Sequence, residues 1–130
     1  MRIYFGTTAE ELQEFLREGS IEIPEVYAPT PIYSKAHPDM DEEEVEYALS
    51  LLAAEDALDF LDDQSGAALV LALEVDENQL GAFDEISAEV HLPLQWSDVE
   101  AVFLVGEDAE DLTWFAPQEA ALSIEDWLKS

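Results

Sequence analysis

The chain of 130 residues has the length of a single domain, and its 48% content of hydrophobic residues is sufficient for a folded core. It contains no cysteine, which excludes disulfide bonds, a thiol nucleophile and cysteine-ligated metal centres. Its 32 acidic residues stand against 4 basic ones, a formal net charge of −28, which disfavours direct binding to nucleic acid phosphates.

A strand and a helix are predicted at the start of the chain. Residues 2–5 are mostly apolar and favour β-structure, and Gly6 is expected to end the strand. Thr7 and Thr8 each precede a glutamate by three residues, which is the spacing of a capping box. A helix is therefore predicted to begin there and to end at Gly19.

The next segment contains several prolines. Residues 21–30 alternate between apolar and polar side chains, but Pro24 and Pro29 interrupt the alternation. Because proline cannot donate a backbone hydrogen bond, this pattern predicts an edge strand or an extended connection. Residues 31–38, which begin and end with proline, are expected to form a loop that can include one helical turn.

The longest predicted element is a helix that begins near Asp39 or Asp41 and ends near Asp62. Its first turn is rich in acidic residues, and the positive end of the helix dipole stabilises negative charge at that place. One stripe of apolar side chains predicts the side that faces the core, and it consists of Tyr47, Leu51, Ala54, Leu58 and Leu61. Leu49 and Phe60 lie nearly opposite, so that side is either covered by another layer or loop, or presented to a partner.

The second half of the chain is rich in predicted strands. These strands are residues 67–75, covered on both faces, then residues 85–92, 101–105 and 112–115, followed by a last helical turn from Ser123. The order predicts one α+β domain over residues 1–130. Its expected core is a mostly antiparallel sheet of four to five strands with two main helices, one of them long and central.

The acidic residues are unevenly distributed. Residues 39–46 contain six acids and residues 107–111 contain four. Clustered carboxylates can attract a basic surface, whereas evenly spread charges are largely screened at physiological salt. The predicted partner-binding residues are Asp39, Asp41, Glu42, Glu43, Glu44, Glu46, Leu49, Phe60, Glu107, Asp108, Glu110 and Asp111. An exposed tryptophan among such acids is a further candidate contact.

Motifs for catalysis or for a cofactor are missing. The sequence has no nucleophile elbow and no phosphate-binding glycine loop, and the acidic run at 39–46 lacks the spacing of an EF-hand. Glu89 and His91 supply only two potential metal ligands, fewer than a stable transition-metal site needs. No catalytic residue, metal or cofactor is therefore expected. The enzyme alternative is a carboxylate-dependent hydrolase that uses Glu55 or Glu119.

Two stretches carry a resemblance to a known family. They are residues 43–48 with the alanine- and leucine-rich helix that follows, and residues 112–119, which read Leu-Thr-Trp-Phe-Ala-Pro-Gln-Glu. With the opening Met-Arg-Ile-Tyr, they resemble a family of short acidic proteins of unknown function from high-GC Gram-positive bacteria. The resemblance implies a cytoplasmic bacterial protein and assigns no catalytic residue.

These observations favour a non-enzymatic acidic domain that binds a basic protein surface, or that occludes a nucleic-acid-binding protein in this way. An acidic surface that only increases solubility in a salty cytoplasm is the remaining alternative. The longest apolar run, residues 67–73, is too short to cross a membrane, and no signal peptide is expected. A homodimer is compatible with the sequence.

Overall fold

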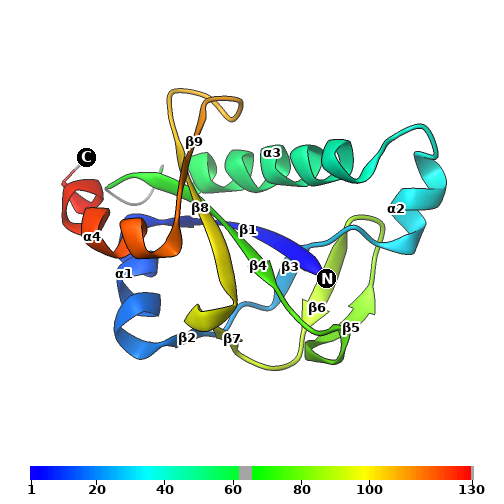
Figure 1. The fold of residues 1–130 in the computed structure, drawn as a ribbon, viewed down its shortest axis with the longest axis horizontal. Coiled ribbons are helices and arrows are strands. Elements are labelled where there is room, and N and C mark those ends of the chain that lie inside the picture. Colours follow the sequence, from blue (N-terminus) through cyan, green and yellow to red (C-terminus); the bar gives the residue numbers. More distant parts are fainter. Residues whose placement is uncertain (62–65, 130) are drawn as a thin grey trace.

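The computed structural model describes residues 1–61 and 66–129, with α-helices and β-strands arranged as in Figure 1. The helices are α1 (Ala9–Glu18), α2 (Pro31–Ala36), α3 (Glu42–Phe60) and α4 (Pro117–Leu128). The strands are β1 (Arg2–Thr8), β2 (Ser20–Ile21), β3 (Glu25–Tyr27), β4 (Ala68–Glu74), β5 (Leu80–Phe83), β6 (Ser87–Val90), β7 (Leu94–Gln95), β8 (Val99–Val105) and β9 (Leu112–Phe115). Short 3₁₀ turns precede β5 and β8.

Seven of the described strands form one antiparallel sheet in the order β5-β6-β3-β1-β4-β8-β9, and β2 pairs with β7 in a second, two-stranded sheet. The α+β class is as predicted, but the predicted count of four to five strands is wrong, as is the count of two main helices. Strands of two to four residues, such as β2, β7 and β5, are too short to show an alternating pattern. β3 was predicted as an edge strand or connection, yet it lies between β6 and β1.

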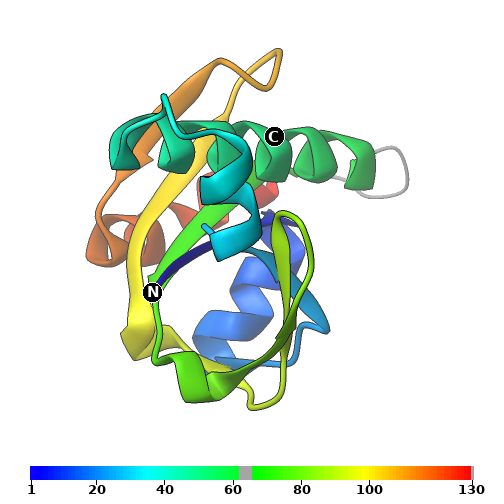
Figure 2. The ribbon, with the colours of Figure 1, turned by 90° about the vertical axis from the view of Figure 1, so that its right-hand side faces the viewer.

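Helices cover both faces of the large sheet. Figure 2 shows α3 on one side of the sheet and α1 on the other. Strand β4 divides its side chains between two hydrophobic cores: Leu69, Leu71 and Leu73 face α1 and α4, whereas the smaller Ala68, Val70 and Ala72 face α3. All six are at most 1% exposed. This confirms the prediction of a central strand that is buried on both faces.

Small residues allow α3 to lie close to the sheet. A Cβ atom on Gly6 would overlap the carbonyl oxygen of Ala53 and would lie 2.8 Å from the backbone nitrogen of Ala57. Gly6 does not end β1, which continues to Thr8. Its place in the strand therefore reflects the close approach of a helix rather than a turn.

The predicted core-facing side of α3 is confirmed only at Ala54, which is buried, and at Leu58 and Leu61, which pack half-buried against the same core. The buried residues are Val45, Leu49, Ser50, Ala53, Ala54 and Ala57, whereas Tyr47 is 55% exposed. The prediction gave weight to large apolar side chains, but the close contact with β1 selects small ones. The predicted helix end at Asp62 lies outside the described residues.

Local signals explain the helix ends that were predicted. Thr8 accepts a hydrogen bond from the backbone nitrogen of Glu11 at the start of α1, and Gly19 ends that helix with a left-handed φ of 79°. Asp41 and Glu44 form a capping box at the start of α3. The final helix α4 begins at Pro117, earlier than the predicted turn from Ser123. Within the described ranges, no helix is long and apolar enough to span a membrane.

Candidate functional site

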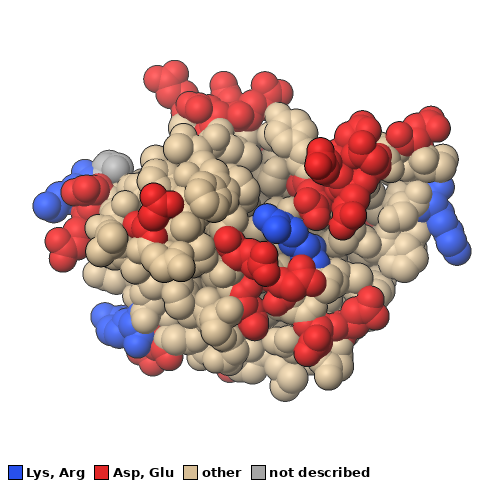
Figure 3. Space-filling model, in the orientation of Figure 1, with Lys and Arg blue, Asp and Glu red and all other residues tan. Residues whose placement is uncertain are grey.

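The predicted acidic segments lie at two separate places. Residues 39–46 precede and begin α3, and residues 107–111 form the loop between β8 and β9. Figure 3 shows acidic side chains over both places, with uncharged surface between them. The structure therefore puts the two segments on the same visible side of the molecule without merging them into one cluster.

The acids of these segments are exposed, except for the half-buried Glu46. Some of them have local structural roles: Asp41 caps α3, and Asp108 accepts a hydrogen bond of 3.0 Å from the backbone nitrogen of Glu110. In the part of the chain that the structure describes, none of the ten carboxylates has a cationic group within 4.0 Å. Their negative charge is therefore available to a partner.

Glu46 differs from the other acids of its segment. Burial raises the pKa of its carboxyl group, and the charges of Glu42 and Glu43 raise it further, against the attraction of Arg2. Arg2 itself lies 3.9 Å from Glu100 and donates a hydrogen bond of 2.9 Å to the hydroxyl of Tyr4. This arginine is thus shared among strands β1 and β8 and helix α3.

The two apolar candidates have different surroundings. Leu49 is fully buried in the core beneath α3, whereas Phe60 is 46% exposed. They are eleven residues apart and so lie within about 20° on the helix. Their burial differs because the C-terminal part of α3 lies over a cleft, which Phe60 lines. Trp114 on β9 is 57% exposed and follows the acidic loop 107–111 by three residues.

The cleft under Phe60 is the site that the sequence analysis missed. Its volume is about 690 Å³, within the range of pockets that hold small ligands or short peptide segments. It opens where β1 and β3 diverge, since these two strands are in register only at Tyr4 and Tyr27. We call it the β1 cleft. It is bounded by Phe5 and Gly6 of β1, one side of α1, residues 20–27, the C-terminal half of α3, and Ser87.

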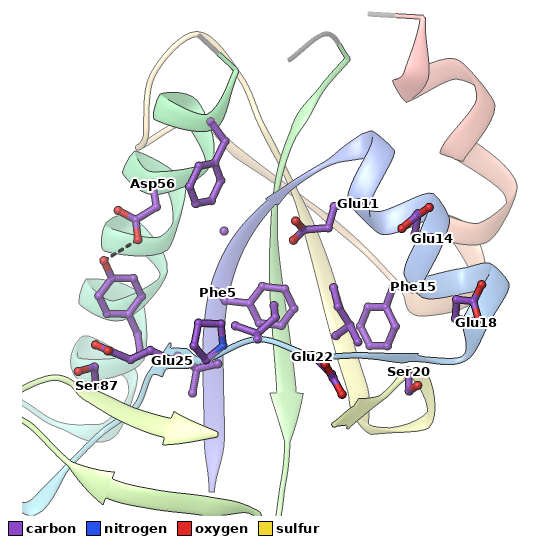
Figure 4. Close-up of a pocket in the computed structure, with 17 residues that line it drawn as sticks. Phe5, Glu11, Glu14, Phe15, Glu18, Ser20, Glu22, Glu25, Asp56 and Ser87 are labelled. Carbon is purple, nitrogen blue, oxygen red and sulfur yellow. Dashed lines mark hydrogen bonds between the residues drawn. The ribbon is translucent and has the colours of Figure 1, made fainter. Parts of the chain in front are cut away.

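Figure 4 shows how α1 and α3 face one another across the β1 cleft. Glu11 extends from α1 toward the middle of the cleft, and Asp56 lies on α3 at the opposite wall. Buried Phe5 and Phe15 form part of an apolar floor. Six carboxylates line the cleft: Glu11, Glu14, Glu18, Glu22, Glu25 and Asp56.

Hydrogen bonds hold two of these carboxylates in place. The hydroxyl of Tyr27 donates to Asp56 Oδ2 at 2.6 Å, which joins β3 to α3 (Figure 4), and the hydroxyl of Thr7 donates to Glu11 Oε1 at 2.8 Å. Burial raises the pKa of Tyr27 far above that of a free tyrosine, and the bond to Asp56 raises it further. Tyr27 therefore remains a hydrogen-bond donor to Asp56 at neutral pH.

One cation lies beside the β1 cleft. Among the described residues, Arg17 is the only cation that forms ion pairs with any of these six carboxylates. It lies 2.8 Å from Glu14 and 3.9 Å from Glu18. The cleft thus combines an apolar floor with a net negative rim. The spacing of Glu11, Glu14 and Glu18 at i, i+3 and i+7 on one helix was a usable signal for this rim.

The candidates for the enzyme alternative lie apart from this cleft lining. Glu55 is exposed on α3, and Glu119 accepts a hydrogen bond of 3.0 Å from the backbone nitrogen of Ala116 at the start of α4. His91 lies 3.6 Å from Glu89, and His37 stacks on Tyr33. Among residues 1–61 and 66–129, no group of three or more potential ligands is placed to hold a metal ion.

A family model described as a family of unknown function, DUF6912, matches residues 1–113. The chain belongs to DUF6912. This membership confirms the expected relation to an uncharacterised family. Searches of curated proteins and of solved structures gave no significant match. The DUF6912 match includes every element that lines the β1 cleft and ends within β9, before α4.

Proposed function

We propose that this DUF6912 protein is a non-enzymatic binding domain for a basic protein. The observation that carries the proposal is that residues 39–46 and 107–111 hold ten carboxylates, nine of them exposed, none of which has an ion-pair partner among the described residues. Charges of this kind attract an oppositely charged surface and accelerate its approach. Exposed Trp114 beside the acidic loop supports the proposal, because tryptophan often contributes strongly to binding at interfaces.

The test is affinity capture from the native cell extract, followed by measurement with the purified partner. We expect the captured protein to be rich in lysine and arginine and its Kd to rise at least tenfold between ~50 and ~500 mM salt, because salt screens exposed charges. A variant with Glu42→Gln, Glu43→Gln, Glu107→Gln and Glu110→Gln should capture less of it. A partner without excess basic residues, or an affinity that salt does not change, would contradict the proposal.

A further inference from the structure

We infer that the β1 cleft binds a short extended polypeptide segment carrying lysine or arginine, and that this segment adds a strand to the edge of β1. The inference rests on the proposed function, because it states in which form a basic partner is recognised. It concerns a site separate from residues 39–46 and 107–111, so the two can be tested separately.

The first observation is an unpaired stretch of β1. This strand pairs with β4 along all of residues 2–8, but with β3 at Tyr4 alone. In an antiparallel pair, successive residues direct their N–H and C=O groups alternately toward one neighbour and away from it. One of Phe5 and Gly6, which line the cleft, therefore directs its backbone groups away from β4, toward the side on which Tyr4 alone of β1 is in register with β3. A backbone in extended conformation supplies the matching donor and acceptor.

The second observation is that the cleft has two different walls. Side chains of an added strand would point alternately to its two faces. One set would meet Asp56 and half-exposed Phe60 on α3, and the other would meet Glu11 and the floor around Phe15 on the α1 side. Two consecutive basic residues would thus each reach a carboxylate, and their aliphatic portions would cover aromatic surface.

The third observation is the charge of the lining. The six carboxylates of the cleft are opposed by Arg17 alone within the described residues. A second copy of this chain carries the same net charge of −28, so self-association through this cleft is electrostatically unfavourable. A small organic cation would satisfy the carboxylates but not the open backbone edge. A basic extended segment satisfies both.

The test uses three blocked six-residue peptides with two central arginines between valines. One peptide is unmodified, and the other two carry N-methyl groups on one or the other set of alternate backbone nitrogens, which leaves the charge unchanged. Because an added strand pairs through one edge only, we expect one methylated peptide to bind at least about tenfold more weakly and the other to bind like the unmodified peptide. Calorimetry at ~50 mM salt measures all three affinities.

A matched pair of protein variants tests the location. Glu11→Gln with Asp56→Asn removes two charges from the cleft and preserves an acceptor for Tyr27. Glu107→Gln with Glu110→Gln removes two charges from the β8–β9 loop. We expect the first pair to weaken binding of the unmodified peptide about tenfold, and the second less than about twofold. Circular dichroism and urea unfolding verify that both variants are folded.

The outcomes separate this inference from the proposed function. Equal effects of the two methylation patterns overturn strand addition but leave a basic partner possible. Equal weakening by the two variant pairs overturns the β1 cleft as the site, since overall charge then explains the attraction. Lack of binding by the unmodified peptide overturns the inference as well. It leaves the proposed function unaffected, because that proposal is tested by the composition and the salt dependence of the captured partner.

Discussion

Gly6 of β1 lies so close to Ala53 of α3 that a methyl group on Gly6 would overlap the carbonyl oxygen of Ala53. The clash is with helix backbone, which cannot rotate away as a flexible side chain can. The approach of α3 to the sheet therefore depends on the absence of a side chain at Gly6 and on the short side chain of Ala57 above it.

The substitution Gly6→Ala should lower the free energy of unfolding by about 1–3 kcal/mol, because overpacking forces backbone shifts. Gly81→Ala is the matched control, since the three atoms nearest to a Cβ on Gly81 of β5 all belong to the ring of exposed His91, which can move. We expect the control to change stability by no more than ~0.5 kcal/mol. Urea unfolding compares the two, and equal losses would contradict the proposed helix–strand contact.

Leu49 and Phe60 provide a second comparison on one side of α3. Leu49→Ala should lower the free energy of unfolding by about 2–5 kcal/mol, because it opens a cavity in a fully buried core. Phe60→Ala should cost about 1 kcal/mol or less, because nearly half of this side chain is already exposed over the cleft. Chemical denaturation measures both values. A larger loss for Phe60 would indicate that this part of α3 is covered in solution.

The hydrogen bond from Tyr27 to Asp56 makes a prediction about alkaline pH. The folded-state pKa of Tyr27 is raised above its unfolded value, so its contribution to stability is complete below about pH 10 and is lost as pH rises further. Tyr27→Phe should lower the free energy of unfolding by about 1 kcal/mol at pH 7, because it removes this hydrogen bond. The variant should also lose less stability than the wild type as pH rises above 10.

Tyr47→Phe is the control for Tyr27→Phe, because Tyr47 is 55% exposed. Ultraviolet titration of the phenol groups, combined with unfolding at pH 7 and above pH 10, distinguishes the variants. If the phenol of Tyr27 ionises at the pKa of a free tyrosine, the hydrogen bond to Asp56 is not maintained.

The raised pKa of Glu46 predicts that the stability of the fold changes at mildly acidic pH. Its folded-state pKa is raised, so the native protein holds the proton more tightly and gains stability as pH falls from 7 toward the unfolded value near 4.5. Glu46→Gln should therefore raise stability at pH 7 and show a smaller gain between pH 7 and 5. Exposed Glu55→Gln on the same helix controls for the loss of one charge. Thermal unfolding at both pH values gives the comparison.

Added salt should stabilise the fold. With a formal net charge of −28, repulsion between like charges opposes the compact state, and salt screens it. The ion pairs that salt would weaken are few and exposed, such as Arg17 with Glu14, and contribute little. We expect Tm to rise steadily in graded sodium chloride. A constant or falling Tm would mean that repulsion does not limit stability.

The sequence was sufficient to predict the elements whose signals are local. The ends of α1 and the start of α3 follow from side chains that bond to nearby backbone, such as Thr8 and Asp41. The strand at β4 follows from its apolar composition. These features depend on neighbours within a few residues, and such neighbours are visible in a sequence.

Features that depend on distant contacts were not predictable in this way. The side of α3 that is buried is decided by Gly6, which is more than forty residues earlier in the chain. The β1 cleft exists because β3 leaves β1 after a single pair of residues, which no local pattern records. The position of Phe60 over that cleft, rather than over the core, follows from the same divergence.

Helix α4 has a consequence for where this domain should be cut in experiments. The DUF6912 match stops at residue 113, in the middle of β9, but Ala120 and Trp127 of α4 are part of the core beneath α1. The backbone oxygen of Trp127 also accepts a hydrogen bond from Ala67, just before β4. A fragment trimmed to residues 1–113 would lose both Phe115 and Trp127, whose rings meet edge-on, and would expose the core side chains that α4 covers. The matched region is thus shorter than the folded core, and fragments made for experiments should retain residues up to 129.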